Sequence, residues 1–399
     1  MVAKRRWWQV PRLRTNEEDR YERRTGWQEL FFDLVFVVIV SELAHYLAGH
    51  TTLAGIGSYI VLFVPVWWVW IGGTIYNDRF ETYDISYRFF VFLQMLPVAA
   101  MAIFVHDGLA TNSRGFALAY AVVRILLISM WLRGGYHDAR YRPVTTRYAL
   151  GFSCSVLLFI ASVFVPAPWR YGLWGLGAMF DLLTPITTLQ LQARLPALNS
   201  SNLPERFATF VLIVLGEAVV GVVQGIAGLS TLTPSLALTG TLGMALVFGL
   251  CWIYFDFVAR RRPRHNVWAQ VVWTYLHLPL VMTTAALGAA VVNVLSAGND
   301  LPALASRYLF NDAVGVALIA IGLLELTLRA EADEPTWAPV SVGLKLGAGL
   351  VAIIIGLMAL PVRSIVSLLL LILLVAIQMV YGAYVWYRPT QHRDVILEA

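Results

Sequence analysis

Long apolar stretches separated by short polar segments run along the whole chain. Each stretch has about 20 residues or more, the length that an α-helix needs to cross the hydrocarbon core of a bilayer. The pattern predicts an all-α integral membrane protein with about twelve transmembrane helices, at residues 27–48, 53–76, 86–105, 115–135, 146–166, 169–190, 205–226, 235–258, 267–294, 307–328, 339–360 and 364–387. The short link at 166–168 is also compatible with a kink inside a re-entrant pair.

The distribution of Lys and Arg supports this number of spans. With 59% hydrophobic and only 13% charged residues, the chain lies outside the range of soluble proteins. Basic residues accumulate in cytoplasmic loops. If the N-terminus is cytoplasmic, the inner segments hold eight basic residues before position 26 and thirteen later arginines, whereas the outer loops hold Arg114, Arg170, Arg307 and Arg363. Both termini are therefore expected on the cytoplasmic side.

Similar motifs recur in the same order in the two parts of the chain, which suggests two parallel six-helix repeats. The matched segments begin at Glu29 and Glu205, at Trp70 and Trp252, and at Met95 and His277. Apolar helices also resemble each other by chance. The organisation that we predict is a basic cytoplasmic tail at 1–26, a first half at 27–190, a cytoplasmic linker at 191–204, a second half at 205–387 and a cytoplasmic tail at 388–399.

Composition also limits the ligands. The net charge of +5 comes from loops and tails, where it sets topology and contacts anionic lipid, so nucleic-acid binding is not expected. Cys154 and Cys251 both lie in apolar segments, which disfavours a disulfide framework or a Cys-based zinc site. We expect no cofactor and no metal. The expected partners are membrane lipid and a small ion or solute of unspecified identity, and self-association is left open.

The first span carries ionisable residues that are costly in hydrocarbon. At 100° per residue, Glu29 and Asp33 share one face, whereas Glu42 and His45 lie together on the opposite face. A carboxylate facing lipid costs about 2.5–3.5 kcal/mol on insertion scales. This helix is therefore predicted to be central, with protein or water on both flanks.

The second half carries candidates of the same kind. Glu217 lies near the middle of the seventh span, and Gln224 falls on the same face two turns later. Gly221 and Gly225 form a G-x-x-x-G pair that allows close helix approach. His277 lies near mid-membrane, two residues before Pro279, which frees backbone hydrogen-bonding groups of the helix close to the histidine. A carboxyl or histidine hydrogen-bonded between helices is the structural alternative for each site.

Four further charged residues suggest structural pairing. A buried ion pair between Arg124 and Asp181 would satisfy both side chains at mid-membrane depth. Asp256 and Glu325 lie near inner helix ends beside arginines, which favours interfacial ion pairs. Lys345 enters the eleventh span from the inside, where its side chain could extend to the interface.

Several of these segments resemble the bacterial low-temperature-requirement protein A (LtrA) family. The similar motifs are E-L-F-F-D-L-V-F-V at Glu29–Val37, E-L-A-H at Glu42–His45, E-R-F-A-T-F-V-L-I-V-L-G-E at Glu205–Glu217, W-I-Y-F-D at Trp252–Asp256 and Y-L-H-L-P-L-V at Tyr275–Val281. The resemblance implies a multi-pass protein of the bacterial inner membrane, named for a growth defect in the cold. It implies no settled biochemical activity.

Ionisable groups at several depths favour a secondary transporter or an ion pathway. The side chains expected to bind or relay protons or cations are Glu29, Asp33, Glu42, His45, Glu217 and His277. One alternative is a membrane-embedded enzyme acting on a lipid or lipid-linked substrate, with acid/base chemistry at Glu42 and His45. Against it, the chain lacks the usual hydrolase and nucleotide-binding motifs. The other alternative is a structural or sensory protein whose carboxylates lock helices together.

Overall fold

The chain folds into an almost wholly helical bundle. The computed structural model describes residues 9–13, 26–81, 84–195, 202–228, 233–259, 261–296, 304–329, 337–358 and 364–387. Within these ranges the two strands β1 (Arg12–Leu13) and β2 (Phe80–Glu81) have two residues each and pair antiparallel. Most of the predicted tails at 1–26 and 388–399, and the middle of the predicted linker at 191–204, lie outside the described residues.

Each of the twelve predicted spans corresponds to a long helix, so the all-α membrane fold is confirmed. These helices are α1 (Trp27–Gly49), α2 (Leu53–Arg79), α3 (Ile85–Val105), α4 (Ser113–His137), α5 (Arg142–Ser162), α6 (Trp169–Thr187), α8 (Leu203–Ala227), α9 (Pro234–Tyr254), α10 (Val267–Ser296), α11 (Leu304–Thr327), α12 (Ala338–Leu357) and α13 (Ser364–Tyr387). The short helix α7 (Leu189–Gln192) follows α6, and the π-helical segment η1 (Phe255–Ala259) continues α9.

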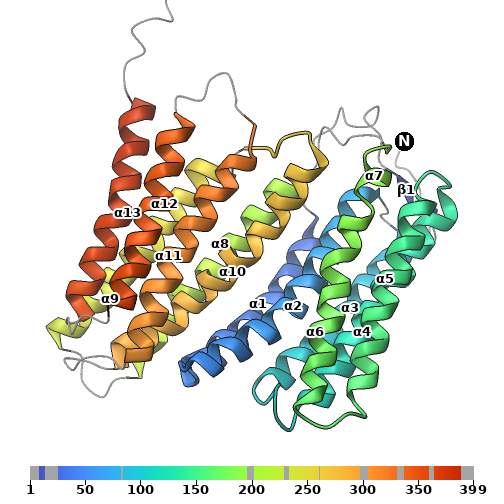
Figure 1. Ribbon diagram of the computed structural model, residues 1–399, viewed down its shortest axis with the longest axis horizontal. Coiled ribbons are helices and arrows are strands. Elements are labelled where there is room, and N and C mark those ends of the chain that lie inside the picture. Colours follow the sequence, from blue (N-terminus) through green and yellow to red (C-terminus); the bar gives the residue numbers. More distant parts are fainter. Residues whose placement is uncertain are drawn as a thin grey trace, which may run out of the picture.

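Eleven helices in the described residues are long and apolar enough to cross a membrane. The remaining long helix, α6, carries Arg170 and Asp181 but runs alongside its neighbours (Figure 1). It packs against α5, and the chain between Ser162 and Trp169 reverses direction completely. With eleven candidate spans, the chain is a multi-pass membrane protein.

Side chains outside the helices satisfy the first backbone N–H groups of several spans. The hydroxyl of Thr52 accepts from the N–H of Gly55 at 3.2 Å, and the hydroxyl of Thr233 accepts from the N–H of Leu236 at 3.3 Å. The carboxylate of Asp84 accepts from the N–H of Tyr87 at 2.9 Å. Because N-terminal N–H groups lack partners within their own helix, these caps fix where α2, α3 and α9 begin.

The helices form two groups that lie side by side, α1–α6 in blue to green and α8–α13 in yellow to red (Figure 1). Neighbours within the groups correspond: α1 packs on α3 as α8 packs on α10, and α4 packs on α5 as α11 packs on α12. The division into two six-helix halves stays a proposal, and we use "halves" for α1–α6 and α8–α13. The halves meet along α1 and α2 on one side and α8 and α10 on the other.

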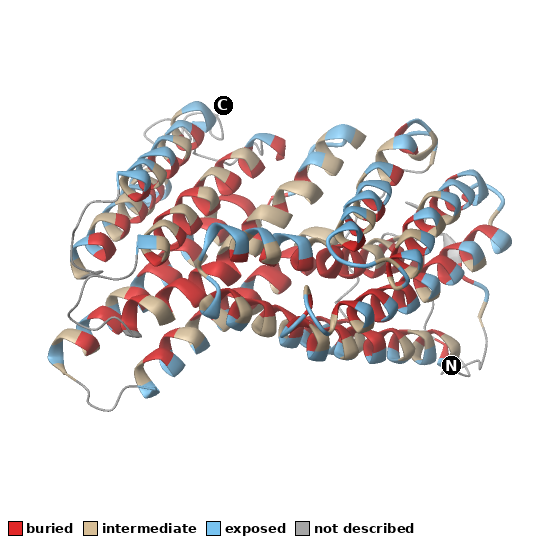
Figure 2. Ribbon diagram, turned by 60° about the horizontal axis from the view of Figure 1, so that its bottom comes forward, coloured by how far each residue is buried: buried red, intermediate tan, exposed pale blue. Residues whose placement is uncertain are grey.

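Buried residues concentrate where the helices meet, and exposed residues lie on the outer faces (Figure 2). Many of the exposed side chains are large and apolar, among them Ile103, Leu157, Phe248 and Leu373. Such a surface is unfavourable in water and favourable in lipid. We use "basic end" for the end of the bundle at which α2, α4 and α11 finish, uppermost in Figure 1, and "opposite end" for the other.

Helices α8 and α10 approach closely through glycines, as the G-x-x-x-G pair at Gly221 and Gly225 predicts. A Cβ atom added to Gly221 would lie 3.0 Å from the carbonyl oxygen of Gly288, and one added to Gly288 would lie 3.0 Å from Cα of Ala218. The obstacles are backbone atoms, so a side chain here cannot be accommodated by a rotamer change.

The substitution Gly288→Val is expected to lower the free energy of unfolding by about 1–3 kcal/mol, because α8 and α10 must move apart. Unfolding in mixed detergent micelles, followed by tryptophan fluorescence, measures this loss. Gly216→Val is the control, since a Cβ atom at Gly216 meets nothing within 4 Å. Equal losses for the two variants would contradict the close-packing explanation.

Candidate functional site

Asp33 lies in a buried ion-pair cluster between the two halves. Its Oδ1 atom accepts from Nη2 of Arg206 at 2.8 Å and from Nε1 of Trp70 at 2.8 Å. Nη1 of Arg206 lies 3.8 Å from Oε1 of Glu29. The Asp33 side chain is 0% exposed. The predicted inner carboxylate patch therefore exists, but it contacts an arginine and a tryptophan rather than water.

The cluster is enclosed by aromatic side chains from both halves. The rings of Trp70 and Phe210 stack with centroids 4.1 Å apart, and the ring of Phe207 meets Trp70 edge-on at 5.1 Å. Burial in such surroundings makes an unpaired carboxylate very costly, so Arg206 is required for Asp33 to be charged here. The sequence placed Arg206 only among the topology-setting arginines, although it lies inside the E-R-F motif at the start of α8.

Two further contacts join α1 and α8 toward the opposite end. The hydroxyl of Ser41 donates to Oε1 of Glu217 at 2.6 Å, and Nε2 of His45 lies 3.2 Å from Oε1 of Gln224. Glu217 and Gln224 thus share a face that meets α1. Glu42 is partly exposed and makes no hydrogen bond or ion pair with the described residues. The predicted outer patch is therefore a seam between α1 and α8 rather than a Glu42–His45 pair.

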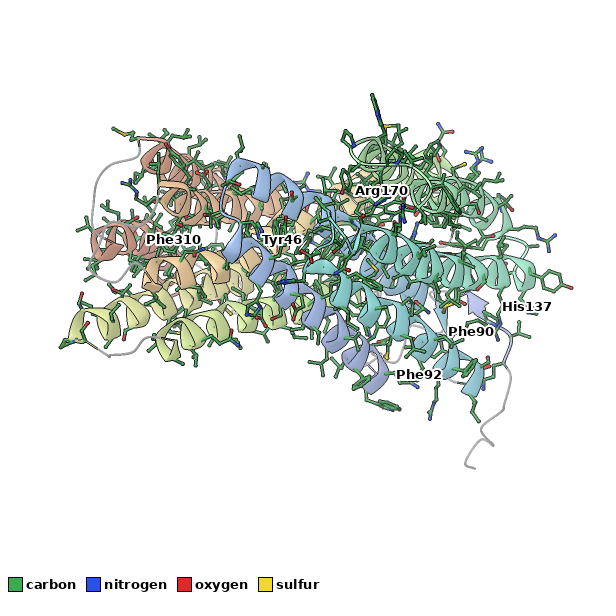
Figure 3. The ribbon with its side chains drawn as sticks, turned by 90° about the horizontal axis from the view of Figure 1, so that it is seen from below. Tyr46, Phe90, Phe92, His137, Arg170 and Phe310 are labelled. Carbon is green, nitrogen blue, oxygen red and sulfur yellow. The ribbon has the colours of Figure 1, made fainter. Side chains whose placement is uncertain are left out.

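Figure 3 shows this central position of α1 from the opposite end: Tyr46 lies between Phe310 of α11 and Arg170 of α6. Arg170 itself was assigned to an outer loop. Its Nε atom donates to the carbonyl of Ser162 at 3.0 Å, and its side chain is buried. This arginine therefore fixes the turn between α5 and α6.

His277 occupies an aromatic pocket in the second half and is 0% exposed. Its Nδ1 atom lies 2.8 Å from the carbonyl oxygen of Trp273, and its Nε2 atom lies 3.1 Å from the hydroxyl of Tyr254. The rings of Phe207 and Trp273 contact it from two sides. Both ring nitrogens have partners, which corresponds to the structural alternative for this residue.

The ion pair between Arg124 and Asp181 is present as the sequence predicted. Nη2 of Arg124 lies 2.5 Å from Oδ1 of Asp181, and both side chains are 1% exposed. The second carboxylate oxygen accepts from the hydroxyl of Ser155 at 2.6 Å and from the hydroxyl of Tyr120. Helices α4, α5 and α6 are thereby joined at mid-membrane depth.

Lys345 does not extend to the interface, so that expectation is wrong. Its Nζ atom donates to Oε2 of Glu325 at 2.9 Å and to the hydroxyl of Ser341 at 2.7 Å, and its side chain is 0% exposed. The reason is that a buried carboxylate, that of Glu325, faces Lys345 from α11.

Asp256 accepts a hydrogen bond from Nε1 of Trp252 at 2.5 Å. The neighbouring Arg260, its expected partner, lies outside the described residues.

Two neighbouring chambers with shared walls lie between the halves at the basic end. The mouth chamber has a volume of about 370 Å³ and the inner chamber about 90 Å³. Both are bordered by Arg79, Gln192, Leu203, Val267, Gln270 and Thr274, which come from α2, α7, α8 and α10. These shared walls place the inner chamber directly beside the mouth chamber, deeper in the bundle.

The two chambers differ in chemistry. Among the described residues, the mouth chamber is bordered by Arg79, Arg262, Arg329 and His265, and by one carboxylate, that of Asp78. The inner chamber is bordered mainly by aromatic and aliphatic side chains, including Trp68, Trp131, Phe152 and Tyr275. A polar, positively charged entrance therefore leads to an apolar end.

The chambers do not contain the carboxylates that the sequence singled out. Of the predicted site residues only Arg124 borders them, at the inner chamber. Glu29 borders a separate cavity of about 10 Å³ between α1, α2, α3 and α4. The described residues bring together no group of three His, Cys, Asp or Glu side chains that could hold a metal ion. Sequence reasoning missed Arg79 as a wall residue because it lies among the loop arginines.

Comparison with known proteins places the chain in one family. A sequence model described as Bacterial low temperature requirement A protein (LtrA) matches residues 24–381. An uncharacterized protein of Rhizobium meliloti (strain 1021) is 29% identical over 287 residues, which cover 66% of this chain and 68% of that protein. No solved structure matches significantly. Because the family match spans α1 to α12 and most of α13, the chain belongs to the bacterial LtrA family.

Proposed function

We propose that this protein is a secondary transporter of the bacterial inner membrane, with its solute site in the chambers between the halves and its basic end facing the cytoplasm. The chambers carry this proposal because they extend from the basic end into the bundle. Trp68 borders the inner chamber and lies eleven residues before the end of α2 at Arg79. At 1.5 Å per residue, the chamber reaches about 16 Å along that helix, to roughly half the bilayer.

Contacts between the halves close the opposite end. The hydroxyl of Tyr59 on α2 donates to the carbonyl of Met282 on α10 at 2.8 Å. Nδ2 of Asn293 on α10 donates to the carbonyl of Ala48 on α1 at 3.0 Å. A cavity that is open on one side and closed by polar contacts on the other is the arrangement expected of an inward-open transporter built from two halves.

The transport proposal does not depend on a proton relay through the carboxylates. Asp33, Asp181 and Glu325 are held by Arg206, Arg124 and Lys345. These pairs favour a structural role. The enzyme alternative depended on Glu42 and His45 acting together, whereas His45 contacts Gln224. We therefore propose no catalytic function.

Alternating access predicts that weakening the closed end shifts the protein toward its outward-open state. Tyr59→Phe with Asn293→Ala removes two hydrogen bonds of about 1 kcal/mol each, which changes the equilibrium between the two states about thirtyfold. A Gln270→Cys reporter in the chamber wall, with Cys154 and Cys251 replaced by Ser, should then react severalfold more slowly with a membrane-impermeant thiol reagent added at the basic end.

The matched control is Tyr171→Phe with Asn311→Ala. Tyr171 donates to the carbonyl of Leu109 within the first half, and Asn311 donates to the carbonyl of Arg307 within α11. Neither bond joins the halves, so the control should react at the parental rate. The transporter proposal would be refuted if the reporter reacted at the same rate in the parent, in the closed-end variant and in the control variant. It would also be refuted if the reporter did not react with reagent added at the basic end.

A further inference from the structure

We infer that the chambers bind an organic anion, with its acidic group at Arg79 and a small apolar or aromatic body in the inner chamber. This inference rests on the proposed function and adds the class of solute. It depends on three features of the cavity: an arginine at the junction of the two chambers, an excess of positive charge at the mouth, and an aromatic wall beyond it.

Arg79 is placed to hold a ligand charge. It is the last residue of α2, is partly buried, and borders both chambers. Its guanidinium makes no hydrogen bond or ion pair with any residue that the structure describes. By contrast, Arg124 at the inner chamber is occupied by Asp181. A planar guanidinium offers paired N–H donors that match a carboxylate or phosphate, so Arg79 is suited to the acidic group of a ligand.

The surroundings of Arg79 increase its attraction for anions. Arg262 and Arg329 border the same mouth chamber, and Asp78 is the one carboxylate that the described part of the chain contributes to it. A cleft lined by charge of one sign, with walls of low dielectric, concentrates counter-ions. Arginines that only set the membrane topology can lie in any cytoplasmic loop and do not need to border a cavity. The position of Arg79 in a chamber wall therefore points to ligand binding.

The inner chamber selects an apolar body. Trp68, Trp131 and Tyr275 present aromatic surface to it, and the ring of Phe152 is covered by the guanidinium of Arg124 at 4.2 Å. An engineered apolar cavity of about 150 Å³ holds a benzene molecule. The inner chamber, at about 90 Å³, is smaller than that cavity, so a short branched chain would fit inside it and a ring would also occupy part of the neighbouring mouth chamber of about 370 Å³. Inorganic phosphate would leave the inner chamber unfilled.

The charge selectivity is tested with the Gln270→Cys reporter in the protein without native cysteines. Anionic and cationic methanethiosulfonate reagents are applied from the basic end, and the ratio of their reaction rates is measured. Removing the charge in Arg79→Gln should lower the anion-to-cation ratio at least about fivefold, because the potential acts with opposite sign on the two reagents.

Two variants separate this effect from general changes. Arg79→Lys keeps the charge and should keep the ratio. Arg140→Gln removes an equal charge at the same end but outside the chambers, from an arginine that is 58% exposed and paired with Asp138, and should leave the ratio unchanged. A ratio that is the same in the parent and in Arg79→Gln overturns the inference, whereas a reporter unreactive to both reagents overturns the proposed function itself.

Ligand class is tested by protection of the same reporter against a neutral maleimide. Benzoate should slow labelling of the parent protein, whereas benzyl alcohol and inorganic phosphate at the same concentration should have less effect. Arg79→Gln should lose protection by benzoate. If benzyl alcohol protected as well as benzoate, the acidic group would not contribute to binding. If phosphate protected as well as benzoate, the apolar body would not contribute to binding. Either result would contradict the inference.

An anionic lipid offers the same combination of charge and apolar chain, so the membrane source is tested directly. The reporter is labelled in nanodiscs of phosphatidylcholine and in nanodiscs that contain phosphatidylglycerol, each with and without benzoate. For a solute from the aqueous side, benzoate protects equally in both. Protection by phosphatidylglycerol alone, with no further effect of benzoate, would overturn the inference in favour of a lipid site.

Discussion

The substitution Arg206→Gln is expected to lower the free energy of unfolding by about 3–5 kcal/mol, which is the cost of leaving one member of a buried ion pair without its partner. Asp33 would keep the Nε1 donor of Trp70 but lose the guanidinium 2.8 Å from its Oδ1 atom. Because the Asp33 side chain is 0% exposed, water cannot replace that contact. The pair joins α1 to α8, so the loss falls on the interface between the halves.

A double-mutant cycle measures the contribution of the pair. Asp33→Asn combined with Arg206→Gln should be less destabilised than the sum of the two single variants, because the introduced asparagine carries no charge that needs the lost guanidinium. Unfolding in mixed micelles provides the free energies. Arg140→Gln, which breaks an exposed pair, is the control and should cost about 1 kcal/mol or less. A similar small loss for Arg206→Gln would show that the cluster does not stabilise the interface.

The membrane fold could be predicted from the sequence because it depends mainly on local composition. A span is recognised by apolar length alone, and the alternation of arginines independently limits the number of spans. The pair Arg124–Asp181 was also predictable, since each residue is a single charge at mid-membrane depth within one half. The same holds for the glycines of α8, whose spacing signals close packing.

Contacts between distant parts of the chain were not predictable in the same way. Arg206 and Asp33 are 173 residues apart, and nothing in the local pattern of either helix indicates that they meet. The chambers are harder still to foresee, because their volume depends on the angle and separation of the two halves. An arginine at a helix end, such as Arg79, has the same sequence pattern whether it contacts lipid or borders a cavity.

Lys345 provides the second large expected effect. The substitution Lys345→Met should lower the free energy of unfolding by about 3–5 kcal/mol, because it removes the ammonium that neutralises a buried carboxylate. Glu325 has 0% side-chain exposure, and its other cationic neighbour, Nη1 of Arg261, lies 3.9 Å from Oε1. The ammonium also lies 3.5 Å from the ring centroid of Phe257 in η1. The loss therefore affects the contact of α12 with both α11 and the π-helical segment.

The charge of Glu325, rather than the volume of Lys345, is expected to cause this loss. Lys345→Met with Glu325→Gln should recover most of the stability, because replacing a whole buried pair by neutral groups of similar size is often neutral. Thermal unfolding in nanodiscs compares the two proteins, and Lys345→Arg, which keeps the charge, tests whether the cavity accepts a larger cation. If the double variant is as unstable as Lys345→Met, the lysine acts through packing against Phe257 and the electrostatic explanation fails.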